Sequence, residues 1–225
     1  ENLNSLDFLL LEDAVKIQDF SPLKNTNIYR LDIRGTNSTH PSLHDSTNLF
    51  DTVKQMGKLY WLELTGFVIS DADSMLELPG LSLLGLWDCE FESKLPQLPN
   101  LESLYIRDSN LTNLNGIGKL PKLNSLYLTK NKQLTTLDGI DKLPKLSSLF
   151  FEENKQLTTL PDLSGSSELT LASLYFSNNQ LSAEELTAKL PKYLQELPEW
   201  PEWLKNNADD LGEPDEPSEP GKPEE

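Results

Sequence analysis

The sequence predicts an α/β solenoid, in which the chain winds into successive similar coils around one long core. Three observations support this. Seven residues repeat letter for letter, because NKQLTTL stands at 131–137 and again at 154–160. The surroundings repeat too, since LPKLNSLYLTK precedes the first copy and LPKLSSLFFEE the second. Leucine supplies 46 of 225 residues although only 37% of the chain is hydrophobic, as expected where one packing position recurs. Self-similarity at a period of about 20 to 50 residues is typical of repeat architectures.

A strand pattern of the form L-x-x-L-x-L-x-x-N recurs at a period near 22 residues. Its copies start at Ile28, Leu59, Leu81, Leu101, Leu123, Leu146 and Leu171, and a weaker first copy is placed at Leu3. This is the pattern of a leucine-rich repeat, whose period is about 20 to 29 residues. We therefore predict a right-handed leucine-rich-repeat superhelix of about eight coils over residues 1–181. It should have a parallel concave β-sheet and a convex side of short 3₁₀ or helical turns.

The pattern also assigns the direction of each side chain. Positions four and six, such as Leu126 and Leu128, should face inward, because side chains alternate along a strand. After each strand comes a second apolar set at a spacing of three, which suits short 3₁₀ turns better than full helices. In one coil that set is Leu134, Leu137, Ile140 and Leu143. The duplicated heptapeptide is therefore the corner that leaves the strand, followed by two inward leucines.

Position nine of the pattern is interpreted as a corner residue. Asn131, Asn154 and Asn179 stand there, and an Asn side chain can bond backbone groups that a tight corner leaves unpaired. Cys89 occupies the same position and is predicted to be a buried corner residue rather than a nucleophile. As the single cysteine, it cannot form an intrachain disulfide. This fits a reducing compartment, but also an exported protein that relies on a large core.

The segments outside the regular pattern have their own predicted roles. Residues 45–56 are polar at the start and apolar at helical spacing, which predicts a helix on the convex side. Residues 182–205 are predicted to form a C-terminal helical cap, because Ser182 and Glu185 make a capping-box pattern. Residues 206–225 hold eight acidic residues, one lysine and four prolines. We expect them to be a disordered acidic tail or linker.

Composition and motifs argue against several functions. A net charge of −17 disfavours nucleic acid and anionic membranes. No apolar run approaches the roughly 18 residues of a spanning helix. His40 and His44 flank Pro41 in a polar stretch, which favours a loop over a zinc site. Nucleotide-binding and hydrolase motifs are missing from the sequence. We expect no catalytic residue, no metal, no cofactor and no enzymatic activity.

The outward-facing columns of the predicted sheet are the candidate binding surface. Position five of successive coils reads Asp7, Asp32, Glu63, Gly85, Tyr105, Tyr127, Phe150 and Tyr175. The four consecutive aromatic residues predict an exposed ridge, which Trp61, Trp87 and Arg107 should extend toward the earlier coils. Stacked rings can stabilise a sheet. Exposed aromatic patches also mark interaction sites, where Tyr, Trp and Arg are enriched. A protein loop and a glycan both remain open as ligands, and we expect a monomer.

The stretch LTNLNGIGKLPKLNSLYLTKNKQLTTLDGIDKLPKLSSLFF resembles the short repeats of bacterial internalin-like surface proteins. The resemblance is specific over residues 95–181 and looser over 1–94. It implies a secreted or wall-attached protein of a Gram-positive-type bacterium, whose concave face binds host or neighbouring-cell surface molecules, with the tail as a spacer. No signal peptide is present in this chain, which starts at Glu1, as expected of a processed or trimmed product. An intracellular scaffold or regulatory subunit is the alternative, and a target-selecting array beside an enzyme domain is a third.

Overall fold

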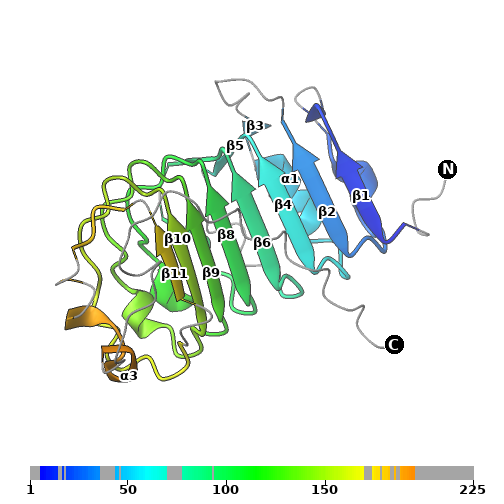
Figure 1. Ribbon diagram of the computed structural model, residues 1–225. Coiled ribbons are helices and arrows are strands. Elements are labelled where there is room, and N and C mark those ends of the chain that lie inside the picture. Colours follow the sequence, from blue (N-terminus) through cyan, green and yellow to red (C-terminus); the bar gives the residue numbers. More distant parts are fainter. Residues whose placement is uncertain are drawn as a thin grey trace.

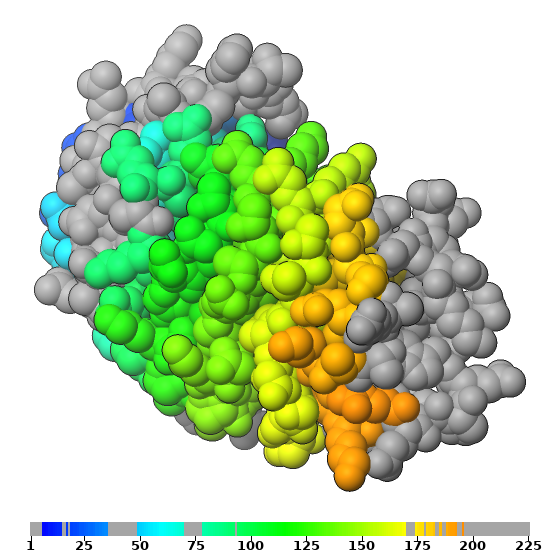
Figure 2. All heavy atoms as spheres, turned by 90° about the vertical axis from the view of Figure 1, so that its left-hand side faces the viewer, coloured from blue at the N-terminus to red at the C-terminus, as the bar shows by residue number. Residues whose placement is uncertain are grey.

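The computed structural model is a solenoid built on one long parallel sheet (Figure 1). It describes residues 6–14, 17, 19–35, 44–45, 47–69, 78–92, 94–169, 174–177, 179–182, 185 and 188–195. Figure 2 shows the later coils from the side as adjoining bands that run in order from green to orange. The predicted fold class is confirmed.

Eight strands form the main sheet, and all of their pairings are parallel. Their spatial order follows the chain, so each coil adds one strand beside the last. In that order they are β1 (Phe8–Leu11), β2 (Arg30–Arg34), β4 (Trp61–Thr65), β6 (Leu83–Trp87), β8 (Ser103–Arg107), β9 (Ser125–Thr129), β10 (Ser148–Glu152) and β11 (Leu174–Ser177).

The core lies between the sheet and the return segments, as the leucine pattern predicts. Leu126 and Leu128 are fully buried, and their neighbours Ser125, Tyr127 and Thr129 are partly exposed. The second apolar set, Leu134 to Leu143, is also buried. Buried residues from Ala14 to Leu190 form one continuous cluster, so a single core spans the described coils.

Where the structure describes them, the return segments carry little helix. One α-helix, α1 (Thr47–Val53), confirms the predicted convex helix, and the 3₁₀ turns η3 (Ser21–Leu23), η5 (Ile117–Lys119) and η6 (Ile140–Lys142) confirm the expectation drawn from spacing of three. Gly116 and Gly139 precede η5 and η6, each with φ of 99°, in the left-handed region that favours glycine. A side chain at Gly139 would also lie 2.9 Å from Cγ2 of Ile117.

In the later coils a hydrogen-bonded ladder closes the corner that follows the strand. The Asn154 side chain accepts a bond from the Asn131 backbone N–H at 3.0 Å and donates to the Leu128 carbonyl at 2.9 Å. The Asn131 side chain does the same one coil earlier, accepting from Ser109 at 3.2 Å. Asn179 repeats the arrangement one coil later. The predicted asparagine ladder is confirmed.

Cys89 lies in the same ladder, as predicted. Its backbone N–H donates to Oγ of Ser109 at 3.1 Å, and its thiol lies 3.3 Å from the Trp87 carbonyl oxygen. Burial raises the pKa of the thiol to about 12, so the reactive thiolate is suppressed at neutral pH.

A second, smaller parallel sheet was not predicted. It joins β3 (His44–Asp45), β5 (Phe67–Ile69) and β7 (Glu90–Phe91), which follow β2, β4 and β6 along the chain. Phe67 is fully buried there at the position where later coils have asparagine. Backbone pairing therefore replaces the asparagine ladder in the earlier coils.

The first coil begins at Leu6, three residues later than predicted. Phe8 pairs with Arg30 and Leu9 with Leu31, so Leu9 and Leu11 are the inward residues. The chain there contains four consecutive apolar residues, FLLL, and two phases fit such a run equally well. The earlier placement of Asp7 on the outward column is therefore wrong, and Leu10 stands there instead.

The C-terminal cap is described only in part. Ser182 Oγ accepts a bond from the Glu185 N–H at 3.0 Å, which confirms that capping contact. The Glu185 carboxylate in turn accepts from the Leu160 N–H at 2.9 Å, and α3 (Lys192–Gln195) follows. Residues 196–225, including Trp200, Trp203 and the acidic tail, lie outside the described residues. Within the part described, no helix is both long and apolar enough to cross a bilayer.

Candidate functional site

The sheet register brings the four predicted aromatic residues into one row. Tyr105 pairs with Tyr127, Tyr127 with Phe150, and Phe150 with Tyr175 across four adjacent strands. All four are partly exposed on the side of the sheet away from the core. We call Tyr105, Tyr127, Phe150 and Tyr175 the aromatic column.

Within the column the rings stack face to face. The centroids of Tyr105 and Tyr127 are 4.2 Å apart with planes at 9°, and those of Tyr127 and Phe150 are 4.6 Å apart with planes at 8°. Phe150 and Tyr175 are tilted, at 6.1 Å and 31°. Stacking covers both faces of Tyr127, so its solvent contact is made by ring edges. The rings thus stabilise the sheet while forming its surface.

The column's end tyrosines have raised pKa values. Burial is the main cause for Tyr105, and the neighbouring Tyr127 and the Glu63 carboxylate add to it. For Tyr175, burial raises the pKa first and the negative charge of Glu152 second. Both phenols therefore stay protonated at neutral pH, and a carboxylate stands near each end of the column.

Trp87 completes the column on the side of the earlier strands. Gly85 pairs with Tyr105 in the column's register and contributes no side chain. A Cβ at Gly85 would lie 1.8 Å from Cζ3 and 2.0 Å from Cη2 of Trp87, so the indole occupies that space. Trp87 belongs by sequence to position seven but covers position five. The predicted extension of the ridge at Trp87 is thus present, through a different geometry.

Trp61 is not exposed, contrary to the expectation that it extends the ridge. It is 1% exposed although it stands on the outward face of β4. The guanidinium carbon of Arg30 lies 3.7 Å from its ring centroid, and its indole N–H donates to Glu63 at 2.8 Å. A charged side chain from the neighbouring strand therefore covers the ring, which contributes to stability instead of to a binding surface.

Arg30 is the centre of a charged cluster on β2 and β4. It forms a forked pair with Asp32, through Nε at 3.2 Å and Nη2 at 3.0 Å, and Nη2 also lies 3.5 Å from Glu63. The guanidinium carbon of Arg30 also lies 5.0 Å from the centroid of the Phe8 ring. Asp32 is 1% exposed, so its charge is neutralised inside the cluster. The sequence showed these charges, but the contact between Arg30 and Phe8 depends on the corrected phase of β1.

The corrected first coil adds two residues that the sequence reading missed. Phe8 and Leu10 stand at positions three and five of β1, where they are 42% and 37% exposed. They form a small apolar patch beside the Arg30 cluster. The signal that could have found them is the second phase of the FLLL run, which places Ala14 at the buried ninth position.

Arg107 lies on the outward face of β8, beside Trp87 on β6. Its Nε is 3.3 Å from the Asp108 carboxylate, so it carries a neighbouring counter-charge. It remains about one-third exposed, which leaves the guanidinium accessible beside the column.

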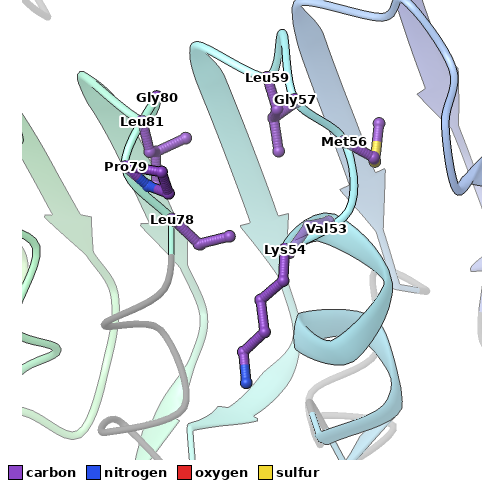
Figure 3. Close-up of a pocket in the computed structure, with 9 residues that line it drawn as sticks. All are labelled: Val53, Lys54, Met56, Gly57, Leu59, Leu78, Pro79, Gly80 and Leu81. Atoms are coloured by element: carbon purple, nitrogen blue, oxygen red, sulfur yellow. The ribbon is translucent and has the colours of Figure 1, made fainter.

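Two cavities outside the aromatic column do not resemble active sites. The smaller, about 40 Å³, lies between α1 and the turn before β6, and its lining is mainly apolar (Figure 3). The larger, about 210 Å³, is an open cleft at the strand ends, lined by Asp88, Glu90, Asp108, Lys130 and Lys132 among others. The pKa of Asp88 is raised by burial and by the Asp108 charge. Among the described residues no group of three metal-ligating side chains converges.

Comparison with protein families finds the leucine-rich-repeat family, two copies, over residues 99–142. A comparison with curated proteins finds no match.

Two examples come from the solved structures that are similar to this chain. One is an internalin (inlF) from Listeria monocytogenes str. 4b F2365, at 21% identity and a TM-score of 0.42, with 76% of this chain and 54% of that chain covered. The other is the leucine-rich-repeat domain of the type III effector XCV3220 (XopL), at 21% identity and a TM-score of 0.51, with 83% and 74% covered. This chain thus spans about half of the internalin structure. The fold is a leucine-rich-repeat solenoid.

Proposed function

We propose that this chain is a non-enzymatic recognition module that binds a protein partner on the outward face of its main sheet. The observation that carries the proposal is the aromatic column itself, four partly exposed rings aligned across β8 to β11. Trp87 adds a fifth aromatic side chain and Arg107 an accessible guanidinium beside it. Tyr, Trp and Arg are the residues that most often dominate binding energy at protein interfaces.

The stacking geometry favours a protein over a glycan. A sugar ring packs against the electron-rich face of an aromatic ring. In the column, the faces of Tyr105, Tyr127 and Phe150 are directed at one another at 4.2 and 4.6 Å. Ring edges suit the apolar and polar side chains of a protein surface better than they suit a flat sugar. Solenoids of this kind commonly bind with their extended sheet surface.

The first candidate setting is a secreted or wall-attached, internalin-like adhesin of a Gram-positive-type bacterium. It is supported by the resemblance of residues 95–181 to internalin-like repeats. The second candidate is an intracellular scaffold or regulatory subunit that uses the same face. The free, buried thiol of Cys89 is compatible with the reducing compartment of this second setting.

A binding screen with the whole chain tests the function. The chain is applied to arrays of cell-surface proteins and of glycans, beside a variant with Tyr105, Tyr127, Phe150 and Tyr175 changed to Ser. Circular dichroism and a urea titration establish whether that variant folds. We expect a protein hit that the folded variant loses. A glycan hit would contradict the choice of partner, and a protein hit that the folded variant keeps would contradict the site.

A milder variant covers the case in which four serines unfold the sheet. Changing Tyr105 and Tyr127 to Phe keeps the stacked rings and removes two hydroxyls. If those hydroxyls bond the partner, affinity should fall by roughly 10- to 100-fold. Trp87→Phe should weaken the same hit, while Lys155→Gln, an exposed change away from the column, should leave it unchanged.

A further inference from the structure

Charge is distributed unevenly along this acidic chain. Residues 94–157, the most regular coils, hold nine lysines and arginines against six acidic residues. The rest of the chain holds ten against thirty. The regular coils are therefore a positive segment within a protein of net charge −17.

Four lysines of these coils lie together on the return segments, away from the aromatic column. Lys119 stands just before the last leucine of one coil's second apolar set and Lys122 stands two residues after that leucine. Lys142 and Lys145 stand 23 residues later at the equivalent positions. A Cβ at Gly118 would lie 3.3 Å from the Cβ of Lys142, so the two return segments are in contact. We call Lys119, Lys122, Lys142 and Lys145 the lysine row.

The lysine row keeps a net positive charge that ion pairs with described residues do not neutralise. All four side chains are exposed, and none forms an ion pair with another described residue. Asp138 and Asp141 share the second return segment, and the two segments together remain net positive. Like charges in adjacent coils repel, and this repulsion is relieved when an acidic segment binds.

The edge of the same coils at the strand ends has a different charge pattern from the return segments. Lys132 and Lys155 are exposed there, but this edge also carries Asp88, Asp108 and Glu153. Glu153 lies 3.6 Å from Lys130. The positive and negative groups named at this edge therefore balance, whereas the two return segments keep a net positive charge.

We propose that the chain's own acidic segment, residues 206–225, docks on the lysine row. That segment has eight carboxylate side chains, one lysine and four prolines, so ionic contacts are the interactions its composition offers. Proline and like charge keep such a segment extended. An extended acidic strand can lie across neighbouring coils and contact lysines in each.

The distance allows this docking. The Leu163 N–H donates to the Lys189 carbonyl at 2.7 Å, so the cap contacts the return segment one coil after η6. One coil spacing is about 4.8 Å, which places the cap roughly 10 Å from the row. Residues 196–205 can span up to about 33 Å when extended. Tethering also gives the tail an effective concentration in about the millimolar range.

Paramagnetic NMR on the full chain tests the proposal. A nitroxide is attached at Ser218→Cys, and the reagent leaves Cys89 unlabelled because that thiol is buried. We expect the amide signals of Lys119, Lys122, Lys142 and Lys145 to lose intensity at low salt, and those of Lys132 and Lys155 to keep it. About 0.5 M NaCl should restore the lost intensity, since screening shortens the range of ionic attraction.

Two matched double variants identify the contact. Lys122→Gln with Lys145→Gln should abolish the intensity loss, while Lys132→Gln with Lys155→Gln should leave it unchanged, although both remove two exposed charges from adjacent coils. Equal losses at both sets of lysines, or none, would overturn the proposal. A mixing control distinguishes docking within one chain from docking between chains: isotope-labelled chain without nitroxide is mixed with unlabelled chain that carries the nitroxide. A loss of intensity in this mixture would also overturn the proposal, because the tail would then bind a second copy.

Discussion

The indole of Trp87 fills the space where a side chain at Gly85 would stand, two residues earlier on the same strand. A Cβ at Gly85 would come within 1.8 Å of the indole's Cζ3. Gly85 is the residue of β6 that pairs with Tyr105, and it has no side chain. The ring of Trp87 therefore extends the aromatic column of β8 to β11 onto β6.

Gly85→Ala should therefore displace Trp87. We expect the free energy of unfolding to fall by about 1–2 kcal/mol, because the indole loses its place on the backbone. The fluorine resonance of 5-fluorotryptophan at position 87, assigned with Trp87→Phe, should shift toward its solvent-exposed value. Gly165→Ala is the matched control, because no atom lies within 4 Å of a Cβ there. An unshifted resonance in Gly85→Ala would show that the indole does not occupy this space.

Asn154→Ala should be among the more destabilising changes to a single polar residue. It removes one acceptor and one donor bond at a site with no solvent exposure, and leaves the Asn131 N–H and the Leu128 carbonyl unpaired. Each unsatisfied buried group costs about 1–3 kcal/mol, so a loss of roughly 2–4 kcal/mol is expected in urea unfolding. Asn115→Ala, at an exposed position, should change stability by less than about 0.5 kcal/mol. Equal effects would mean that the ladder adds nothing to stability.

Arg30→Ala should destabilise far more than Arg34→Ala. Removing Arg30 uncovers Trp61 and leaves the buried Asp32 charge without its forked partner, at a cost of about 3–5 kcal/mol. Arg34 pairs at 3.7 Å with Glu12, where both side chains are largely exposed, and such pairs contribute roughly 0–1 kcal/mol. Chemical denaturation of both variants measures the difference. A loss for Arg30→Ala no larger than for Arg34→Ala would contradict the role given to the cluster.

Because of Cys89, the free energy of unfolding should fall as the pH becomes alkaline. Burial holds the pKa of the folded-state thiol at about 12, above an unfolded value of about 8.5. As pH rises, the thiol therefore loses its proton in the unfolded chain before it does so in the folded chain. The contribution of the protonated thiol to folding stability is fully present below about pH 8.5 and is lost as pH rises toward 12. In that window the wild type should lose about 1.4 kcal/mol per pH unit more than Cys89→Ala. Urea unfolding at pH 8, 9 and 10 measures this, and parallel slopes would show that the thiol titrates normally.

Much of this architecture follows from periodicity. The register of Tyr105, Tyr127 and Phe150 and the asparagine ladder both depend on which residue stands at each repeat position, and the sequence fixes that in the regular coils. The predicted position of the first coil was wrong because the FLLL run fits two strand phases. Only the pairing of Phe8 with Arg30 decides between these phases. The burial of Trp61 and the position of the Trp87 ring depend on side-chain conformations across strands, which no linear pattern encodes.

The duplicated heptapeptide marks equivalent points of two successive coils. Adding or removing the 23 residues from one copy to the next would add or remove one whole coil and keep an asparagine at each ladder position. Each such event would lengthen or shorten the row of rings by one member, about 4.8 Å. The length of the aromatic column is therefore set by the number of coils and can change only in whole steps.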